Sequence, residues 1–270
     1  MSFRPNTDIG QNFLTDSSVV EWMTARANLG PDASVLEIGP GGGVLTNGLL
    51  SSGAARVSAV EIDTRLKKYL EPIAASNPSL SLHWGDAVKF DYAALPPITH
   101  IIANIPYHIT TPLVWRLLEF YSGKTMKYML LMTQAEAAHR LSCGAGARCS
   151  NPLSVTIAAI GRAKTIRKVP RTAFRPMPRV DSAIVEIEFS GHDESTGLPR
   201  DAVWRRLLSG SFAVRRKTLA NNWALSFHTP KARGTEILAA HSLCPMARPE
   251  ELALSDWVNL RHDGNLTMNT

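Results

Sequence analysis

Four consecutive residues at the end of an apolar run, Asn104-Ile105-Pro106-Tyr107, combine two hydrogen-bond acceptors with an aromatic face. The side-chain oxygen of Asn104 and the carbonyl of Pro106 can both accept from an exocyclic adenine amine. That amine is a poor nucleophile because its lone pair is delocalised into the ring, and two acceptors pull it towards a nucleophilic geometry. Tyr107 offers a face on which a flipped-out base can stack. The plainer alternative is a strand that ends in a proline turn.

A glycine-rich turn, EIGPGGGVLT, follows an earlier apolar run and opens a predicted helix. Glycines let the backbone turn sharply and approach a ligand closely. The spacing is G-x-G-x-G, at Gly39, Gly41 and Gly43, and Val44 stands where a dinucleotide-binding pattern would need another glycine. With Glu37 in front of it, this spacing fits S-adenosylmethionine (SAM) better than NAD. A tight structural turn is the alternative.

Two acidic residues follow the next two predicted strands. Glu61 can accept both ribose hydroxyls of an adenosine, or can be a surface carboxylate. Asp86 can accept from the adenine amine of the cofactor, although a helix N-cap is the better reading of this residue alone. Ligands bind outside the carboxyl ends of parallel strands, so the glycine turn, both acids and Asn104 should converge on one crevice. The reaction is then methyl transfer from SAM. Positioning of the amine supplies most of the catalysis, and the amine loses its proton after the transfer.

The elements that must position these residues alternate between buried strands and helices. Strands are predicted at Ser34–Gly39, Val57–Asp63, Leu80–Ala87, His100–Ile105 and Tyr128–Met132, and helices at Ser18–Leu29, Leu113–Tyr121 and Ala135–Leu141. A capping box of Ser18 and Glu21 is expected to begin the first helix. Lys164–Val169 and Ser182–Phe189 resemble a closing antiparallel pair with a long connection. The fold class is therefore α/β, a Rossmann-like methyltransferase with a seven-stranded, mostly parallel sheet.

The composition changes after Phe189. A polar segment with glycine and proline, Ser190–Pro199, reads as a linker. Beyond it, Val203–Phe212, Arg216–Leu225, Gly234–His241 and Pro249–Leu260 are predicted helices. We therefore expect a catalytic domain at residues 1–190 and a small helical domain at residues 191–270.

Charge and cysteine content narrow the possible partners and compartments. The chain has 270 residues, 44% of them hydrophobic, and a formal net charge of +6, which favours a polyanion, nucleic acid first. Three cysteines argue against a disulfide framework and for a reducing compartment, and the Cys143–Cys149 spacing without a second ligand pair makes a zinc site unexpected, so no metal is predicted. The polar N-terminus is unlike a signal peptide, and no apolar segment is long enough to span a bilayer. The expected location is the cytoplasm.

Together these motifs resemble the ribosomal RNA adenine dimethyltransferases of the KsgA/RsmA family over nearly the whole chain. The matching segments are GQNFL (Gly10–Leu14), EIGPGGGVLT, VEID, GDA, NIPY, FRPMPRVDSAIV (Phe174–Val185) and FAVRRKTLANN (Phe212–Asn222). The resemblance implies SAM contacts at Asn12, Leu14, Gly39, Gly41, Glu61, Asp86 and Asn104. It also implies that Phe174 stacks on the target base opposite Tyr107. The implied reaction is two successive methyl transfers to each of two adjacent adenines in the 3′-terminal hairpin loop of small-subunit rRNA.

The sequence departs from the family pattern at three places. Ile105 is more typical of the related Erm enzymes, which methylate one adenine of large-subunit rRNA. The swap conserves volume and leaves the chemistry alone, but it keeps an Erm-like resistance enzyme as an alternative. Ala135 and the Ser150-Asn151-Pro152 segment also depart, near a loop expected to face RNA. A further alternative is a ribosome-assembly binding factor for which methylation is secondary.

Two basic clusters fit an rRNA partner. The first is a run without an intervening acid, Arg162, Lys164, Arg167, Lys168, Arg171, Arg175 and Arg179, and the second is Arg215, Arg216 and Lys217. A charge run is usually only a solvated face. Here the first run leads into Phe174, which favours RNA contacts at Arg171, Arg175, Arg215, Arg216 and Lys217. The expected partner is the small-subunit rRNA of an immature ribosomal subunit, bound by a monomer.

Overall fold

The computed structural model describes residues 11–190 and 194–263. The polar N-terminal stretch, Gly10 of the predicted signature and part of the predicted linker lie outside these residues. Two compact units divide the chain, Met1–His139 with Lys164–Gly191, and Arg140–Ala163 with His192–Thr270. The predicted domain boundary near residue 190 stays a prediction, and the compact units add residues 140–163 to the second group. Within the described residues, no helix is both long and apolar enough to cross a membrane.

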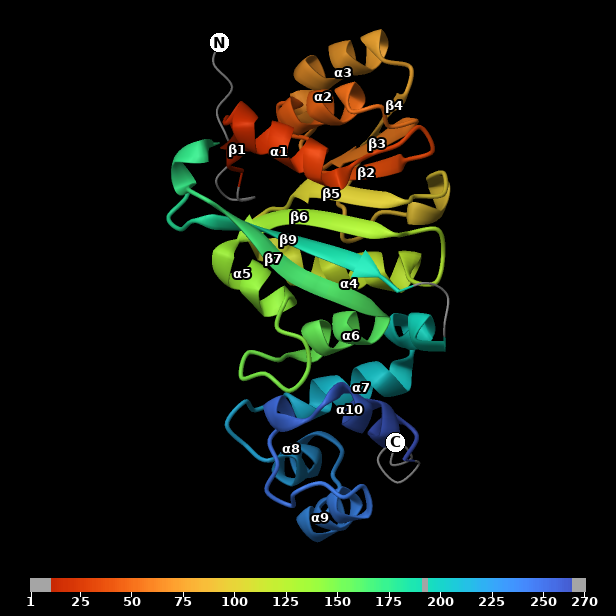
Figure 1. Ribbon diagram of the computed structural model, residues 1–270, viewed down its shortest axis with the longest axis vertical. Helices are drawn as coiled ribbons and strands as arrows, with labels where there is room; N and C mark the ends of the chain where they lie inside the picture. Colours follow the sequence, from red (N-terminus) through yellow and green to blue (C-terminus); the bar gives the residue numbers. More distant parts are fainter. Residues whose placement is uncertain (1–10, 191–193, 264–270) are drawn as a thin grey trace. The chain divides into compact units, whose positions relative to one another are not determined.

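A seven-stranded sheet forms the centre of the first unit, in the order β4-β3-β2-β5-β6-β9-β7 (Figure 1). The strands are β2 (Ser34–Ile38), β3 (Arg56–Glu61), β4 (Leu80–Trp84), β5 (His100–Asn104), β6 (Tyr128–Gln134), β7 (Gly161–Val169) and β9 (Ser182–Phe189). The pairs among β2 to β6 are parallel, and β9 pairs antiparallel with β6. The mostly parallel sheet predicted from the alternating elements is confirmed.

One face of this sheet packs against helices α1 (Ser17–Ala27) and α2 (Val44–Ser51), with α3 (Lys67–Ser76) beside them. Met23 and Leu49 are fully buried against Val35 and Ile102. Alternate strand residues point to this side, as the two-residue period of a strand requires. The predicted capping box is wrong, because the side chain of Asp16 caps α1 by accepting from the backbone N–H of Ser18.

The opposite face carries α4 (Thr110–Tyr121), and α5 (Ala135–Leu141) follows β6. The hydroxyl of Thr110, the first residue of α4, lies 2.8 Å from that of Thr133 in β6. Thr133 neighbours Met132, which belongs to the α1 side, so Thr133 points to the other face. The sheet is therefore covered on both faces, which explains why its strands read as continuous apolar runs.

A two-stranded ribbon of β1 (Phe13–Leu14) and β8 (Phe174–Arg175) was not expected. The strands are antiparallel, with Leu14 opposite Phe174. The hydroxyl and the backbone N–H of Thr15 both donate to the carbonyl of Ala173. The ribbon joins the N-terminal signature to the long connection between β7 and β9, two segments that are about 160 residues apart in sequence.

The second unit is helical, with α6 (Pro152–Ile160), α7 (Ala202–Ser211), α8 (Leu219–Ser226), α9 (Lys231–Ala240) and α10 (Leu254–Arg261). Its core holds three fully buried tryptophans, Trp204, Trp223 and Trp257. Helix α6 was not predicted. The departures at Asn151 and Pro152 begin it, because the Asn151 side chain accepts from two backbone N–H groups and proline occupies the first turn.

A disulfide between Cys143 and Cys149 corrects the cysteine interpretation. The low cysteine count argued against disulfides, but the count says nothing about whether two cysteines six residues apart are brought together by a tight loop. The Cα atoms lie 5.8 Å apart, within the span that a disulfide bridges. Cys244 is free and exposed.

Candidate active site

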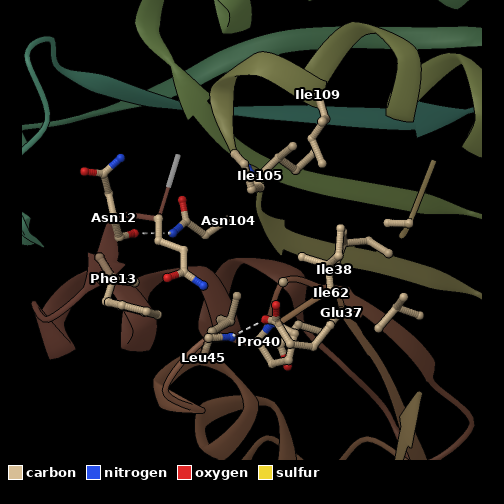
Figure 2. A pocket seen from close by; sticks show the side chains of 18 of the residues that line it. Asn12, Phe13, Glu37, Ile38, Pro40, Leu45, Ile62, Asn104, Ile105 and Ile109 are labelled. Atoms are coloured by element: carbon tan, nitrogen blue, oxygen red, sulfur yellow. Dashed lines mark hydrogen bonds between the residues drawn. The ribbon is translucent and has the colours of Figure 1, made fainter. Parts of the chain in front are cut away.

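A cavity of about 220 Å³ opens at the carboxyl ends of β2, β3, β4 and β5. Its walls include Asn12, Leu14, Glu37, Gly39, Gly41, Glu61, Ile62, Asp86, Asn104, Pro106, Tyr107 and Phe174. Every catalytic and cofactor-binding residue predicted from the sequence is therefore brought to one cavity. Figure 2 shows the side chains of Asn12 and Asn104 on one side of it and those of Glu37 and Pro40 on another.

The glycine turn requires glycine at the positions that line the cavity. Gly39 and Gly41 have φ angles of 67° and 58°, which other residues rarely adopt. A Cβ on Gly41 would also lie 2.9 Å from the Phe13 ring. Gly43, with φ 83°, is the N-cap of α2. The turn therefore brings its backbone close to the cavity in a shape that an alanine would strain.

Glu61 holds this turn from the next strand. Its carboxylate accepts from the backbone N–H of Gly41 at 3.1 Å and from that of Asp63 at 2.9 Å. The side chain is buried, and burial raises its pKa above the ordinary glutamate value, against the lowering effect of these hydrogen bonds. Carboxylate oxygens have further lone pairs, so Glu61 can hold the turn and still accept from ribose hydroxyls.

Asp86 forms a local turn and does not cap a helix. Its Oδ1 accepts from the backbone N–H of Val88 at 2.9 Å, but no helix begins at this position, so the helix N-cap interpretation is wrong. The residue also lines the cavity. The Lys89 ammonium lies 3.9 Å from Oδ2, with the lysine side chain 85% exposed, so this ion pair contributes little.

Asn104 ends β5 at the floor of the cavity. Its side-chain nitrogen donates to the backbone carbonyl of Asn12 at 3.5 Å, a contact drawn in Figure 2. This contact uses the nitrogen end of the amide. The oxygen end is thus the one that a substrate amine would meet, as the proposed chemistry requires.

Pro106 and Tyr107 are more constrained than the sequence suggested. The Pro106 carbonyl already accepts from the backbone N–H of Ile109 at 3.2 Å and lies 3.5 Å from the Thr110 hydroxyl. An amine would therefore share this oxygen with the turn that begins α4. The Tyr107 hydroxyl lies 2.8 Å from Ser182 Oγ in β9, and burial raises the tyrosine pKa. The ring lines the cavity, held at its polar end.

Phe174 reaches the cavity from the β1–β8 ribbon. It is 1% exposed and belongs to the core on the α1 side of the sheet. Its role as a stacking partner for the target base stays a prediction, and a base would have to enter beside a ring that is already packed. Arg171 and Arg175 flank it in sequence and are exposed.

Among the remaining cavity residues, Glu37 was noted in the sequence only as part of the glycine-turn motif, and Ile62 was not singled out. Glu37 is 1% exposed, and its Oε2 accepts from the Thr46 hydroxyl at 2.7 Å. Its Oε1 is buried without a hydrogen-bond partner among the described residues, and burial raises the pKa of Glu37 to about 8. Ile62 is 52% exposed. The signals were an acid inside an otherwise apolar strand and a large aliphatic residue between two acids.

These features fit SAM. An adenosine can stack on the exposed aliphatic surface of Ile62, with its ribose at Glu61 and its amine at Asp86. The unpartnered oxygen of Glu37 suits a cationic ammonium, because a positive charge beside it would favour the ionised carboxylate. The glycines of the strained turn carry no side chain, so the middle of a SAM molecule can approach the backbone of the turn closely.

The predicted RNA residues of the second unit lie on a separate turn. Arg215, Arg216 and Lys217 are all exposed, in the connection between α7 and α8. The Arg215 guanidinium donates to the backbone carbonyl of Arg148 at 3.0 Å. The sequence could not place Arg148 there, since 67 residues separate the two.

Comparisons with known proteins show the family of this chain. A family model described as ribosomal RNA adenine dimethylase matches residues 2–244. The ribosomal RNA small subunit methyltransferase A of Deinococcus radiodurans is 37% identical, over 93% of this chain and 83% of its own. The protein of the same name from Pseudomonas syringae pv. tomato is 35% identical, over 95% and 93%.

Two solved structures share the fold along nearly the whole chain. A dimethyladenosine transferase from Plasmodium falciparum has a TM-score of 0.75 and 26% identity, covering 92% of this chain and 95% of its own. The 23S rRNA methyltransferase ErmE has a TM-score of 0.67 and 27% identity, covering 93% and 98%. The similarity therefore includes the helical second unit as well as the sheet.

Proposed function

The chain belongs to the ribosomal RNA adenine dimethylase family, and we propose that it dimethylates N6 of two adjacent adenines in the 3′-terminal hairpin loop of small-subunit rRNA. SAM supplies the electrophilic methyl group. The observation that carries the chemistry is the convergence of Asn104 and Pro106 on the cavity that also holds Glu61 and the glycine turn.

The side chains of this chain orient and activate the amine. Asn104 Oδ1 and the Pro106 carbonyl accept its two hydrogens, which raises electron density on the nitrogen. Tyr107, fixed through Ser182, holds the plane of the base. Positioning in line with the methyl group then supplies most of the rate. After transfer the nitrogen is cationic and releases its proton to solvent.

Small-subunit rRNA is the proposed substrate because the sequence relatives named above act on the small subunit at 35–37% identity. The Erm alternative rests on Ile105 and on a structural likeness at 27% identity. Ile105 lines the cavity with a side chain that is 1% exposed, and an isoleucine in place of leucine adds no group that could distinguish one RNA from another. We propose that the protein works as a monomer, which size-exclusion chromatography with light scattering would test.

Primer extension on both rRNAs, from cells with and without the gene, tests the substrate. Stops at two adjacent adenines near the small-subunit 3′ end are expected only when the gene is present. A single stop in large-subunit rRNA would instead establish the Erm-like activity.

A role as an assembly factor with secondary methylation is tested with Asn104→Ala. This variant should lose methylation, because it lacks one acceptor for the amine. If it still corrects an assembly or growth defect of the deletion strain, binding is the main role. If the defect persists, methylation is the main role.

A further inference from the structure

The disulfide-closed loop Cys143–Cys149 lies beside the basic turn of the second unit. One hydrogen bond links them, from the Arg215 guanidinium to the Arg148 carbonyl at 3.0 Å. Arg148 is the only charged residue of the loop sequence CGAGARC, and its side chain is exposed. Arg148 therefore lies next to Arg215, although the sequence separates it from both basic clusters.

The loop is held by more than its disulfide. Ser150 Oγ donates to the Gly144 carbonyl at 2.8 Å and accepts from the Ala147 N–H at 3.0 Å. Ser154 Oγ lies 3.2 Å from the same Gly144 carbonyl, and Asn151 donates to the Cys149 carbonyl at 3.3 Å. A short loop tied at both ends and across its middle loses little entropy when it contacts a partner.

Side-chain hydrogen bonds also fix the backbone of the basic turn, Arg215, Arg216 and Lys217. Asn222 in α8 is fully buried, and its side chain accepts from the Val214 N–H at 3.0 Å. It also donates to the carbonyls of Val214 at 3.2 Å and Lys217 at 3.3 Å. Arg215, Arg216 and Lys217 are thus presented on a turn whose backbone is fixed.

The positive charge and the fixed backbone of the loop and the basic turn indicate the kind of partner that they bind. We infer that Arg148 is a further RNA-binding residue, and that the disulfide-closed loop holds it with Arg215, Arg216 and Lys217 as one surface for the phosphate backbone. Among the described residues no carboxylate pairs with these four cations. Four exposed cations on fixed backbone fit a polyanion, and phosphates are the polyanion that the proposed function supplies. The inference rests on that function.

Reduction should weaken this surface. A dithiol attacks one sulfur to form a mixed disulfide, and its second thiol then displaces the other protein thiolate. The disulfide takes up two electrons and two protons to give two cysteine thiols, and the dithiol leaves as a cyclic disulfide. The loop then loses its covalent closure, and Arg148 is less firmly placed beside Arg215.

Binding of the full-length protein to unmethylated small ribosomal subunits tests the inference, measured by biolayer interferometry at several salt concentrations. Arg148→Ala should bind several-fold more weakly, and the slope of log K against log salt should fall by about one. Arg233→Ala is the matched control, because it removes one exposed positive charge in α9 that already pairs with Glu236. Equal affinity of Arg148→Ala and the wild type would overturn the inference.

Dithiothreitol tests the loop. It should weaken binding of the wild type and of Cys244→Ser, whose exposed cysteine is outside the disulfide, but not of Arg148→Ala. The Cys143→Ser/Cys149→Ser double variant should match the reduced wild type without reductant. If reduction leaves wild-type binding unchanged, the disulfide-closed loop does not hold Arg148 for RNA binding. Failure of the proposed function is distinguishable, because the wild type itself would then leave the subunits unmethylated.

Discussion

The hydroxyl of Tyr107 lies 2.8 Å from Ser182 Oγ, and this contact joins the Asn104–Tyr107 tetrapeptide to strand β9. Ser182 is fully buried, so the contact is shielded from water. Its neighbour Asp181 accepts the backbone N–H of Arg171 on its side chain and that of Ala135 on its carbonyl. Asp181, just before β9, and Ser182, its first residue, therefore fix the segment that leads to Phe174 and Tyr107, respectively.

Ser182→Ala should lower the methylation rate about fivefold while leaving SAM affinity unchanged. The reason is that a hydrogen bond of about 1 kcal/mol no longer orients the Tyr107 ring. Tyr107→Phe should lower the methylation rate by a similar factor. Tyr107→Ala should lower the rate further, because the aromatic face on which the base stacks is removed. Single-turnover kinetics and calorimetric SAM titration separate the two effects. Ser81→Ala, in an exposed position of β4, is the control. A wild-type rate for Tyr107→Ala would refute the stacking role.

Gly41→Ala should weaken SAM binding about tenfold or more. The new Cβ would stand 2.9 Å from Phe13 in a left-handed backbone conformation that costs about 1–2 kcal/mol. Gly42→Ala is a control from the adjacent position, because its φ is not positive and no described atom within 4 Å would meet the added carbon. Isothermal titration calorimetry with SAM compares them. Equal losses in both variants would show that the cradle does not depend on the backbone shape at Gly41.

Glu37→Gln should change how stability depends on pH. The folded-state pKa of Glu37 is raised to about 8 by burial, whereas an unfolded glutamate titrates near 4.5. The folded protein therefore binds the extra proton, and its stability is fully present below about pH 4.5 and is lost as pH rises towards 8. The loss is on the order of 1 kcal/mol per pH unit.

Thermal melts of the ligand-free protein between pH 5 and 8 measure this effect. The wild-type melting temperature should fall across the range more steeply than that of Glu37→Gln, which keeps an acceptor for Thr46. Glu71→Gln, an exposed position on α3, should follow the wild type. Parallel curves for the wild type and Glu37→Gln would mean that Glu37 stays ionised in the fold.

The meeting of the site residues at one cavity could be predicted because the carboxyl ends of the strands could be located in the sequence. Once parallel strands were recognised, Gly39, Glu61, Asp86 and Asn104 had to meet at the same edge of the sheet. The β1–β8 ribbon could not be found this way, because strands of two residues carry no periodicity. Leu14 and Phe174 entered the predicted site only through family resemblance, and the ribbon places the two residues opposite each other.

Helix α6 was missed for a different reason. Residues Pro152–Ile160 are apolar on most sides and largely buried, so no 3.6-residue pattern marks them. Asn151, which begins the helix, had been noted only as a departure from the family. Side-chain contacts between distant segments, such as Tyr107 with Ser182 and Arg215 with Arg148, depend on packing that no local pattern encodes.

Asn222→Asp should weaken RNA binding through the backbone of the basic turn. The carboxylate keeps an acceptor for the Val214 N–H but loses both donors, leaving the carbonyls of Val214 and Lys217 unsatisfied at a cost of about 1–3 kcal/mol. The turn should loosen, so affinity for small subunits should fall several-fold while the calorimetric SAM affinity stays at the wild-type value. Asn221→Asp, the less buried neighbour in the same helix, introduces the same charge without touching the turn. If both variants lose affinity equally, the added negative charge explains the effect and the clamp at Asn222 does not.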